Sequence, residues 1–196
     1  MTDSNLGPCT LAGTTVRLEP LRREHTDALF EAAKQLDWKW FLTPLKTRKD
    51  VENRISESLK AEEANEAYVF AVRSLHERTI IGSTSYFGIV PKHKRVEIGS
   101  TWYVPDAWGT AVNPECKYLL LKHAFEDWHA IRVQLTTDIN NAHSQRAIAK
   151  LGAQYEGTLR NYGIRPDGSF RDSKVYSIVA EEWPNVKERL LERIQT

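Results

Sequence analysis

The chain has 196 residues, of which 41% are hydrophobic and 27% are charged, so it can bury a sizeable core, and we expect a single domain over residues 1–196. Lysine and arginine number 27 against 26 aspartate and glutamate residues, and this balance argues against a general surface for nucleic acid or membrane. Cys9 and Cys116 give neither a disulfide framework nor a zinc-ligand spacing. Because there is also no signal peptide and no apolar run of membrane-spanning length, we expect a cytoplasmic protein that holds no metal.

The first third of the chain predicts a strand followed by two helices. Residues 1–13 are mostly polar and contain Gly7, Pro8 and Gly13, so we expect a flexible or loosely docked N-terminal arm. Residues 15–21 alternate between apolar and polar side chains, as a strand does. Residues 25–36 and 50–66 carry the apolar stripe of amphipathic helices.

Three aromatic residues, Trp38, Trp40 and Phe41, stand together between these two helices and are followed by Pro44. Aromatic side chains in a loop can form a lid over a binding pocket. They can equally fill the gap between the two helices, and the sequence leaves both interpretations open.

The middle of the chain predicts three strands and a helix. Residues 67–72 and 80–90 form a hairpin, and residues 96–104 form the next strand. In that strand one side carries Val96, Ile98, Trp102 and Val104, and the other carries Glu97, Gly99, Thr101 and Tyr103. Residues 113–128 then repeat apolar side chains at three- and four-residue steps, which indicates a helix.

The loop between this strand and this helix is a candidate anion site. The first N–H groups of a helix lack partners and lie at the positive end of its dipole, where a phosphate binds well. Gly109 and Ala111 have no Cβ or only a small side chain, so a phosphate could approach the backbone closely. A plain tight turn at Gly109, with Pro114 starting the helix, explains the same residues and remains an alternative.

The last third of the chain predicts a mixed arrangement of strands and helices. Residues 132–138 form a strand, residues 144–151 a short helix closed by Gly152, residues 154–160 and 174–180 a strand pair, and residues 181–194 a final helix. The order is mixed rather than regularly alternating, so we predict an α+β fold and disfavour a doubly wound dinucleotide-binding fold.

The order of these elements, together with three matched segments, resembles the GNAT superfamily of acyl-CoA-dependent N-acetyltransferases. The family's acyl-CoA loop reads Gln or Arg, two residues, Gly, one residue, then Gly or Ala, and residues 106–111 match it except at Asp106. Residues 138–144 and 150–153 are similar to the family's Asp-x-x-Asn-x-x-Ser and Lys-Leu-Gly segments. The resemblance covers about residues 15–183, and residues 156–160 and 167–172 look like the RimJ/RimL branch of ribosomal-protein N-terminal acetyltransferases.

The resemblance implies a central, mostly antiparallel, splayed sheet flanked by helices, with acetyl-CoA bound in the V-shaped gap. Backbone groups of Tyr103 and Val104 would bind the pantetheine arm, together with Asn141, and Ser144 would lie near the sulfur. The pyrophosphate would be held by N–H groups of six residues: Trp108, Gly109, Thr110, Ala111, Val112 and Asn113.

By the same resemblance, the chain would move an acetyl group from acetyl-CoA directly to a primary amine, which could be a protein N-terminus. Glu97 is then our candidate base, and a solvent-facing strand glutamate is the alternative. Many relatives have a tyrosine acid where this chain has Ile148, so Ser144 is our candidate acid, ahead of Tyr103 and Tyr118. A helix N-cap is the competing explanation for Ser144.

The acceptor would bind between the loop of Trp38, Trp40 and Phe41 and residues 160–172, where Asp172 could attract an amine or form an ion pair with Arg171 or Arg160. The partners are acetyl-CoA and either a peptide N-terminus or a small amine, without nucleic acid or membrane. A non-catalytic acyl-CoA sensor is a further alternative, favoured by Asp106 and by Ile148 in place of the tyrosine. The sequence leaves the oligomeric state open, with a homodimer as one option.

Overall fold

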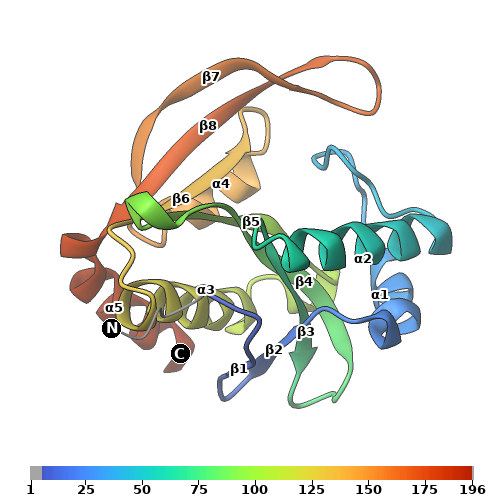
Figure 1. Cartoon of the computed structure of the whole chain (residues 1–196), viewed down its shortest axis with the longest axis horizontal. Helices are drawn as coiled ribbons and strands as arrows, with labels where there is room; N and C mark the ends of the chain where they lie inside the picture. The colour runs from blue at the N-terminus through green and yellow to red at the C-terminus, as the bar shows by residue number, and fades with distance from the viewer. Residues whose placement is uncertain (1–5, 196) are drawn as a thin grey trace.

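The computed structural model, which describes residues 6–195, contains one eight-stranded sheet with helices on both faces (Figure 1). The strand order is β1-β2-β3-β4-β5-β6-β8-β7. In chain order the strands are β1 (Leu11–Ala12), β2 (Val16–Pro20), β3 (Tyr68–Ser74), β4 (Ile80–Val90), β5 (Arg95–Tyr103), β6 (Arg132–Asp138), β7 (Gln154–Ile164) and β8 (Phe170–Val179). The helices are α1 (Thr26–Ala33), α2 (Arg48–Glu63), α3 (Val112–Lys122), α4 (Ala142–Ala149) and α5 (Trp183–Gln195).

Helices α1 and α2 lie on one side of the central strands, and α3 and α5 pack together on the other side (Figure 1). Every neighbouring pair of strands is antiparallel except β5 and β6, which run parallel. The predicted α+β class and the mostly antiparallel sheet are therefore confirmed. The predicted ends of the strands agree best with the structure where apolar and polar residues alternate clearly. Strands β4 and β6 begin and end at the predicted residues.

The parallel pairing between β5 and β6 is short. Only Arg95, Val96 and Glu97 pair across to β6, with Glu97 opposite Gln134. Beyond that point β5 continues to Tyr103 and β6 to Asp138 without pairing to each other. The predicted splay is thus present, and it leaves the facing backbone groups of both strands without sheet partners.

A β-bulge at Ser100 reverses the faces of the β5 residues that follow it, so the predicted faces of Trp102 and Tyr103 are wrong. Gly99 pairs with Ser85 and Trp102 with Ser83, so two residues of β5 stand opposite one residue of β4. Ser100 is the extra residue and has φ +48°. As a result Trp102 shares a face with Glu97, whereas the sequence pattern placed it with Val96.

The side chain of Tyr103 moves to the opposite face for the same reason. It is buried against α3 beside the thiol of Cys116, and burial raises the pKa of both groups, that of Cys116 to about 12. Tyr103 is therefore not placed to act as the acid of the gap. Tyr118, the other reserve candidate, packs its ring against Trp183 of α5.

The described part of the predicted N-terminal arm, residues 6–13, is docked on the folded domain through Leu6. Leu6 is fully buried, and its carbonyl oxygen lies 3.0 Å from Nε2 of His123. The buried Glu115 carboxylate accepts hydrogen bonds from the N–H groups of residues 14–16 and from the Thr14 hydroxyl, at 2.7–2.8 Å. Gly13 is required beside it, because a Cβ there would lie 2.4 Å from the carboxyl carbon. Residues 1–5 lie outside the described part of the chain.

Candidate active site

The first wall of the gap between β5 and β6 is the end of β5. Val104 donates its N–H to the carbonyl of Ile81 in β4, and its own carbonyl accepts from Ala107. Successive residues of a strand direct their backbone groups to opposite edges, so Tyr103 presents its backbone groups toward the gap. The indole N–H of Trp108 donates to the Tyr103 carbonyl at 3.0 Å. Of the two predicted backbone contacts, Tyr103 is therefore the better placed.

The loop from residue 108 to residue 113 offers several free backbone donors. The N–H of Trp108 bonds to Pro105, and that of Val112 to the Thr110 hydroxyl. Within residues 6–195 no acceptor is found for the N–H groups of four loop residues: Gly109, Thr110, Ala111 and Asn113. These donors precede or begin α3, so the helix dipole adds positive potential to them.

Gly109 keeps this loop open. Its φ is +76°, a conformation that favours glycine, and nothing lies within 4 Å of where a Cβ would be. Trp108 and Thr110 on either side are exposed. Asp106, the residue that departs from the family pattern, is exposed as well and leaves the backbone donors free.

The second wall is the start of α4, and here the predicted helix boundary is wrong. The helix begins at Ala142 rather than Ser144, and its N-cap is Asn141, whose Oδ1 accepts the N–H of Ser144 at 3.0 Å. The capping explanation for Ser144 is therefore excluded. The half-buried Ser144 hydroxyl makes no hydrogen bond to any other described residue. The Asn141 amide nitrogen is also left as a donor.

The two walls approach each other at Trp108 and His143. Their rings lie 6.0 Å apart at an interplanar angle of 42°. Since Trp108 belongs to the loop and His143 to the first turn of α4, the predicted cofactor-binding segments do come together. The sequence did not single out His143 because an exposed histidine next to a helix start has no distinctive pattern.

Glu97 lies where the two strands part. Gln134 donates to its carboxylate at 2.7 Å. Burial raises the pKa of Glu97 above its ordinary value, and hydrogen bonds from Thr136 and Gln134 only partly offset that effect. A carboxylate with a raised pKa is better suited to accept a proton from an amine than an exposed one. The alternative of a freely solvated strand glutamate does not fit this environment.

The predicted aromatic loop combines both interpretations, because Trp38 and Phe41 are packed between other elements and also line a pocket. Trp38 is 4% exposed and donates its indole N–H to the carbonyl of Ala33. Its ring makes edge contacts with Phe41 and Trp102, at centroid distances of 5.0 and 5.3 Å. Trp38, Phe41 and Trp102 together line a pocket. Trp40 does not line it and instead stacks under the ammonium of Lys39.

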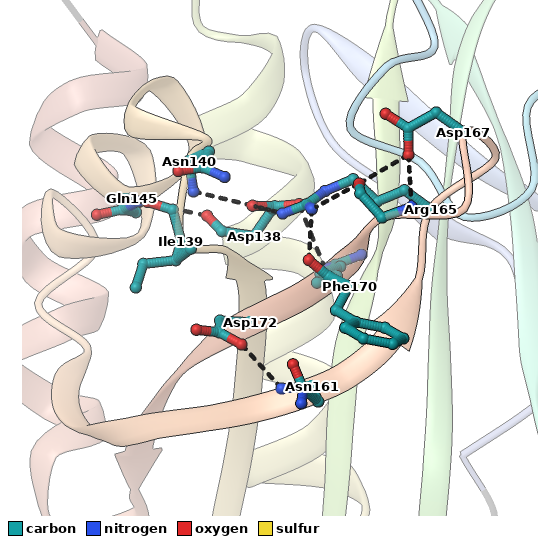
Figure 2. A network of polar contacts seen from close by, with 11 residues as sticks. Asp138, Ile139, Asn140, Gln145, Asn161, Arg165, Asp167, Phe170 and Asp172 are labelled. Carbon is teal, nitrogen blue, oxygen red and sulfur yellow. Dashed lines mark hydrogen bonds and ion pairs between the residues drawn. The ribbon is translucent and has the colours of Figure 1, made fainter.

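A polar network that the sequence did not predict ties the β7–β8 hairpin to the end of β6 (Figure 2). The Asp138 side chain is 1% exposed and accepts two hydrogen bonds from Arg165, at 2.8 and 3.0 Å, and one from the N–H of Asn140. Burial alone would raise the pKa of Asp138, but these donors outweigh it and the pKa is lowered. The guanidinium of Arg171 lies 3.8 Å away.

Asp172 is placed differently from the prediction. Its carboxylate accepts the N–H of Asn161, where β7 bulges, so it pairs with neither Arg171 nor Arg160 (Figure 2). The neighbouring Arg171 points to the opposite face of β8, which is the face that carries Asp138 and Glu97. Asp172 thus shapes the hairpin, and Arg171 is the residue that shares a face with Glu97.

Residues 6–195 include no helix that is long and apolar enough to cross a membrane. In the same part of the chain, no cluster of three or more histidine, cysteine, aspartate or glutamate side chains could hold a metal ion.

Comparison with known proteins agrees with this geometry. The family described as "Acetyltransferase (GNAT) domain" matches residues 15–154. The chain belongs to the GNAT acetyltransferase family. The N-acetyltransferase YoaA of Bacillus subtilis (strain 168), itself uncharacterized, is 30% identical over 102 residues, which cover 52% of this chain and 56% of YoaA.

Two further relatives extend the likeness. YdaF of Bacillus subtilis (strain 168), provisionally named as a ribosomal N-acetyltransferase, is 25% identical over 113 residues, or 58% of this chain and 61% of YdaF. The chain therefore spans less than two thirds of either relative. A crystal structure from T. thermophilus, provisionally assigned as an acetyltransferase, has a TM-score of 0.84 and 36% identity, and covers 96% of this chain and 98% of its own. The GNAT fold of this chain extends beyond the matched family segment to α5.

We predict that Asp138→Asn lowers the free energy of unfolding by about 3 kcal/mol, because it leaves two arginines without a buried carboxylate. Urea denaturation at pH 7 measures this. The folded pKa of Asp138 is lowered, so its contribution is complete above about pH 4 and is lost as the pH falls through the folded value. The difference between the two proteins should therefore shrink in acid.

The control is Asp27→Asn, which removes an exposed partner of Arg48. Because solvent screens an exposed ion pair, this change should alter the free energy of unfolding far less than Asp138→Asn does. Equal losses in the two variants would show that the Asp138 network is no more than a surface ion pair.

Proposed function

We propose that this GNAT protein is an N-acetyltransferase that moves an acetyl group from acetyl-CoA directly to a primary amine. The observation that carries the proposal is the gap between β5 and β6. One wall has free backbone donors at residues 109–111 and 113, and the other has Asn141 and Ser144. An extended arm with a pyrophosphate at one end fits these groups. Glu97, with its raised pKa, lies at the point where the gap begins.

Each of these residues has a role that follows from its position. The N–H groups of Gly109, Thr110, Ala111 and Asn113 would hold the pyrophosphate. The Tyr103 backbone would bind the pantetheine arm as an added strand, and the amide nitrogen of Asn141 would donate to it. Acetyl-CoA supplies the activated acyl group.

The chain then has to manage two protons. An ammonium does not attack a thioester, so Glu97 accepts the amine's proton, directly or through a water molecule. The thiolate that leaves needs a proton, and the Ser144 hydroxyl, which has no other partner in the described structure, would give it one and recover it from solvent. Cys116 has no part in this step, because its thiol is fully buried and its pKa is raised to about 12.

The acceptor could be a protein N-terminal α-amine, as the RimJ/RimL-like segments and the provisional name of YdaF suggest. The alternative is a small amine, for which the small aromatic pocket of Trp38, Phe41 and Trp102 is suited. Consumption of acetyl-CoA with a panel of small amines and N-terminal peptides separates the two. Binding of acetyl-CoA without turnover on any acceptor would instead support a non-catalytic sensor.

We predict that Ala111→Glu abolishes acetyl-CoA binding, because a carboxylate beside the loop donors repels the pyrophosphate and blocks its approach. Calorimetry should show a Kd raised at least ~100-fold, equivalent to about 2.7 kcal/mol. The thermal midpoint should stay unchanged, since an acidic side chain at a helix start is not destabilising. Ala111→Ser is the control and should bind normally; wild-type affinity in the glutamate variant would remove the loop from the site.

Glu97→Gln should lower turnover at saturating amine by roughly 100-fold. A base works only when deprotonated, so the wild-type rate should rise with pH through the raised pKa of Glu97. The variant should lose that rise. Rates measured from pH 5 to pH 9 test this, with Glu77→Gln in the exposed β3–β4 turn as control; full turnover at every pH would exclude Glu97 as the base.

Ser144→Ala should reduce the chemical step by about 10- to 100-fold while leaving acetyl-CoA affinity unchanged. Single-turnover kinetics and calorimetry measure the two quantities separately. Ser144→Thr keeps a hydroxyl and should retain more activity. A loss of affinity or of folding in the alanine variant, without a slower chemical step, would assign Ser144 a structural role.

A further inference from the structure

The acceptor-side pocket contains one charged side chain, and it is a cation. The pocket lies between α1, α2 and the bulge of β5, and its aromatic walls are Trp38, Phe41 and Trp102. Arg54 of α2 and Ser100 of the bulge also line it, and the remaining lining residues are apolar apart from Thr43 and Ser83. No aspartate or glutamate contributes to the lining, which is unusual for a site that receives an amine.

The guanidinium of Arg54 forms neither a hydrogen bond nor a salt bridge with any residue that the structure describes. The acidic group whose charge reaches it is Glu57, one helical turn away. It is half-buried, and the loss of water lowers its pKa. By contrast, Arg48 on the same helix is exposed and pairs with both Asp27 and Glu52.

An arginine that is removed from water without a carboxylate costs stability. Arginine presents five N–H donors in a planar fork that matches a carboxylate. A ligand carboxylate inside the pocket would therefore satisfy a group that the protein leaves unsatisfied.

The same face of the sheet carries a second cation without hydrogen bonds. Among residues 6–195, the buried Nε of Arg171 has no hydrogen-bond partner, and neither has the buried hydroxyl of Ser173, two residues along β8. Arg171 interacts electrostatically with both Glu97 and Asp138. Asp138 is already hydrogen-bonded to Arg165. The acceptor side thus has two arginines without a hydrogen-bonded carboxylate and one further carboxylate, Glu97, and so has an excess of positive charge.

We propose that the acceptor is an amine that also carries a carboxylate on an apolar skeleton, and that Arg54 binds this carboxylate while the amine faces Glu97. The inference deepens the proposed N-acetyltransferase function and rests on it. The apolar part lies against the three aromatic rings. A free amino acid and an acidic N-terminal residue of a peptide share this chemistry.

The first arm of the test compares matched acceptors by release of CoA. Wild type should acetylate phenylalanine with a kcat/KM at least ~10-fold above that for 2-phenylethylamine, which lacks only the carboxylate. In Arg54→Gln the preference should disappear, mainly through a raised KM for phenylalanine, while 2-phenylethylamine is unaffected. Arg48→Gln, on the same helix but outside the pocket, should behave as wild type.

The second arm distinguishes the source of the carboxylate. Two amidated tripeptides, Glu-Ala-Ala and Gln-Ala-Ala, differ only in the charge of the first side chain. If the glutamyl peptide is preferred and phenylalanine is not, the carboxylate belongs to a peptide N-terminus; if phenylalanine is preferred, it belongs to a free amino acid. An equal rate with and without a carboxylate in both comparisons would overturn the proposal, although the amine acetyltransferase would stand.

A binding measurement separates failure of this proposal from failure of the proposed function. The probe is 3-phenylpropanoate, a carboxylate with no amine, titrated into wild type and Arg54→Gln by calorimetry. Binding to wild type that is lost in the variant supports the site even if no acceptor is acetylated. Absence of binding to wild type, or equal binding to both proteins, overturns it. The variant should melt at or above the wild-type temperature, since it removes an unpaired cation.

Discussion

The structure depends on one constraint, which is that β5 and β6 pair over three residues and then part. Two neighbouring strands normally satisfy each other's N–H and C=O groups, and a pair that separates leaves both edges unsatisfied. In this protein different elements follow the two strands, and the facing edges of β5 and β6 stay apart. After β5 the chain enters the loop that leads into α3, and after β6 it enters the short helix α4. What remains between them has the hydrogen-bonding character of a missing strand, and an extended amide-containing arm can take that place.

The bulge at Ser100 converts this gap into a site with two sides. It turns Tyr103 toward α3, where the side chain supports the core, and it turns Trp102 toward α1 and α2, where the side chain lines a pocket. Glu97, before the bulge, shares the face of Trp102 after it. Glu97, our proposed base, and the pocket of Trp102 therefore lie on one side of β5 because of a single residue in a left-handed conformation.

Local patterns were enough to predict most of the fold. Alternation and helical periodicity placed β4, β6 and the main helices, because each pattern depends only on neighbouring residues. The motifs around Gly109 and Asn141 located both walls of the gap. The bulge escaped prediction because Ser100 has no unusual side chain, and one extra residue inverts every assignment that follows it. The role of Asn141 as cap was missed because Ser144 is an equally common cap, and which of them serves depends on where the chain leaves β6.

Long-range contacts account for the other differences. Docking of Leu6 and the capture of residues 14–16 by Glu115 join segments about one hundred residues apart. The contact of Arg165 with Asp138 joins a hairpin tip to a strand end in the same way. Neither can be read from spacing. Arg54 is the clearest example, since the sequence shows an arginine on a polar helix and only the packing shows that no residue from 6 to 195 forms a hydrogen bond or salt bridge with it.

Glu115 connects the N-terminal part of the chain to the loop before α3. Glu115 lies in the first turn of α3, and its N–H bonds the carbonyl of Ala111. The first turn of α3 therefore binds residues 14–16 through the Glu115 side chain, and its backbone carries one of the free N–H donors, that of Asn113. A chain cut at residue 14 would lose the docked Leu6 segment and free one end of the segment that Glu115 binds. The docked residues 6–13 lie outside the family match, which begins at residue 15, so a domain boundary drawn there would remove the buried Leu6 and its contact with His123.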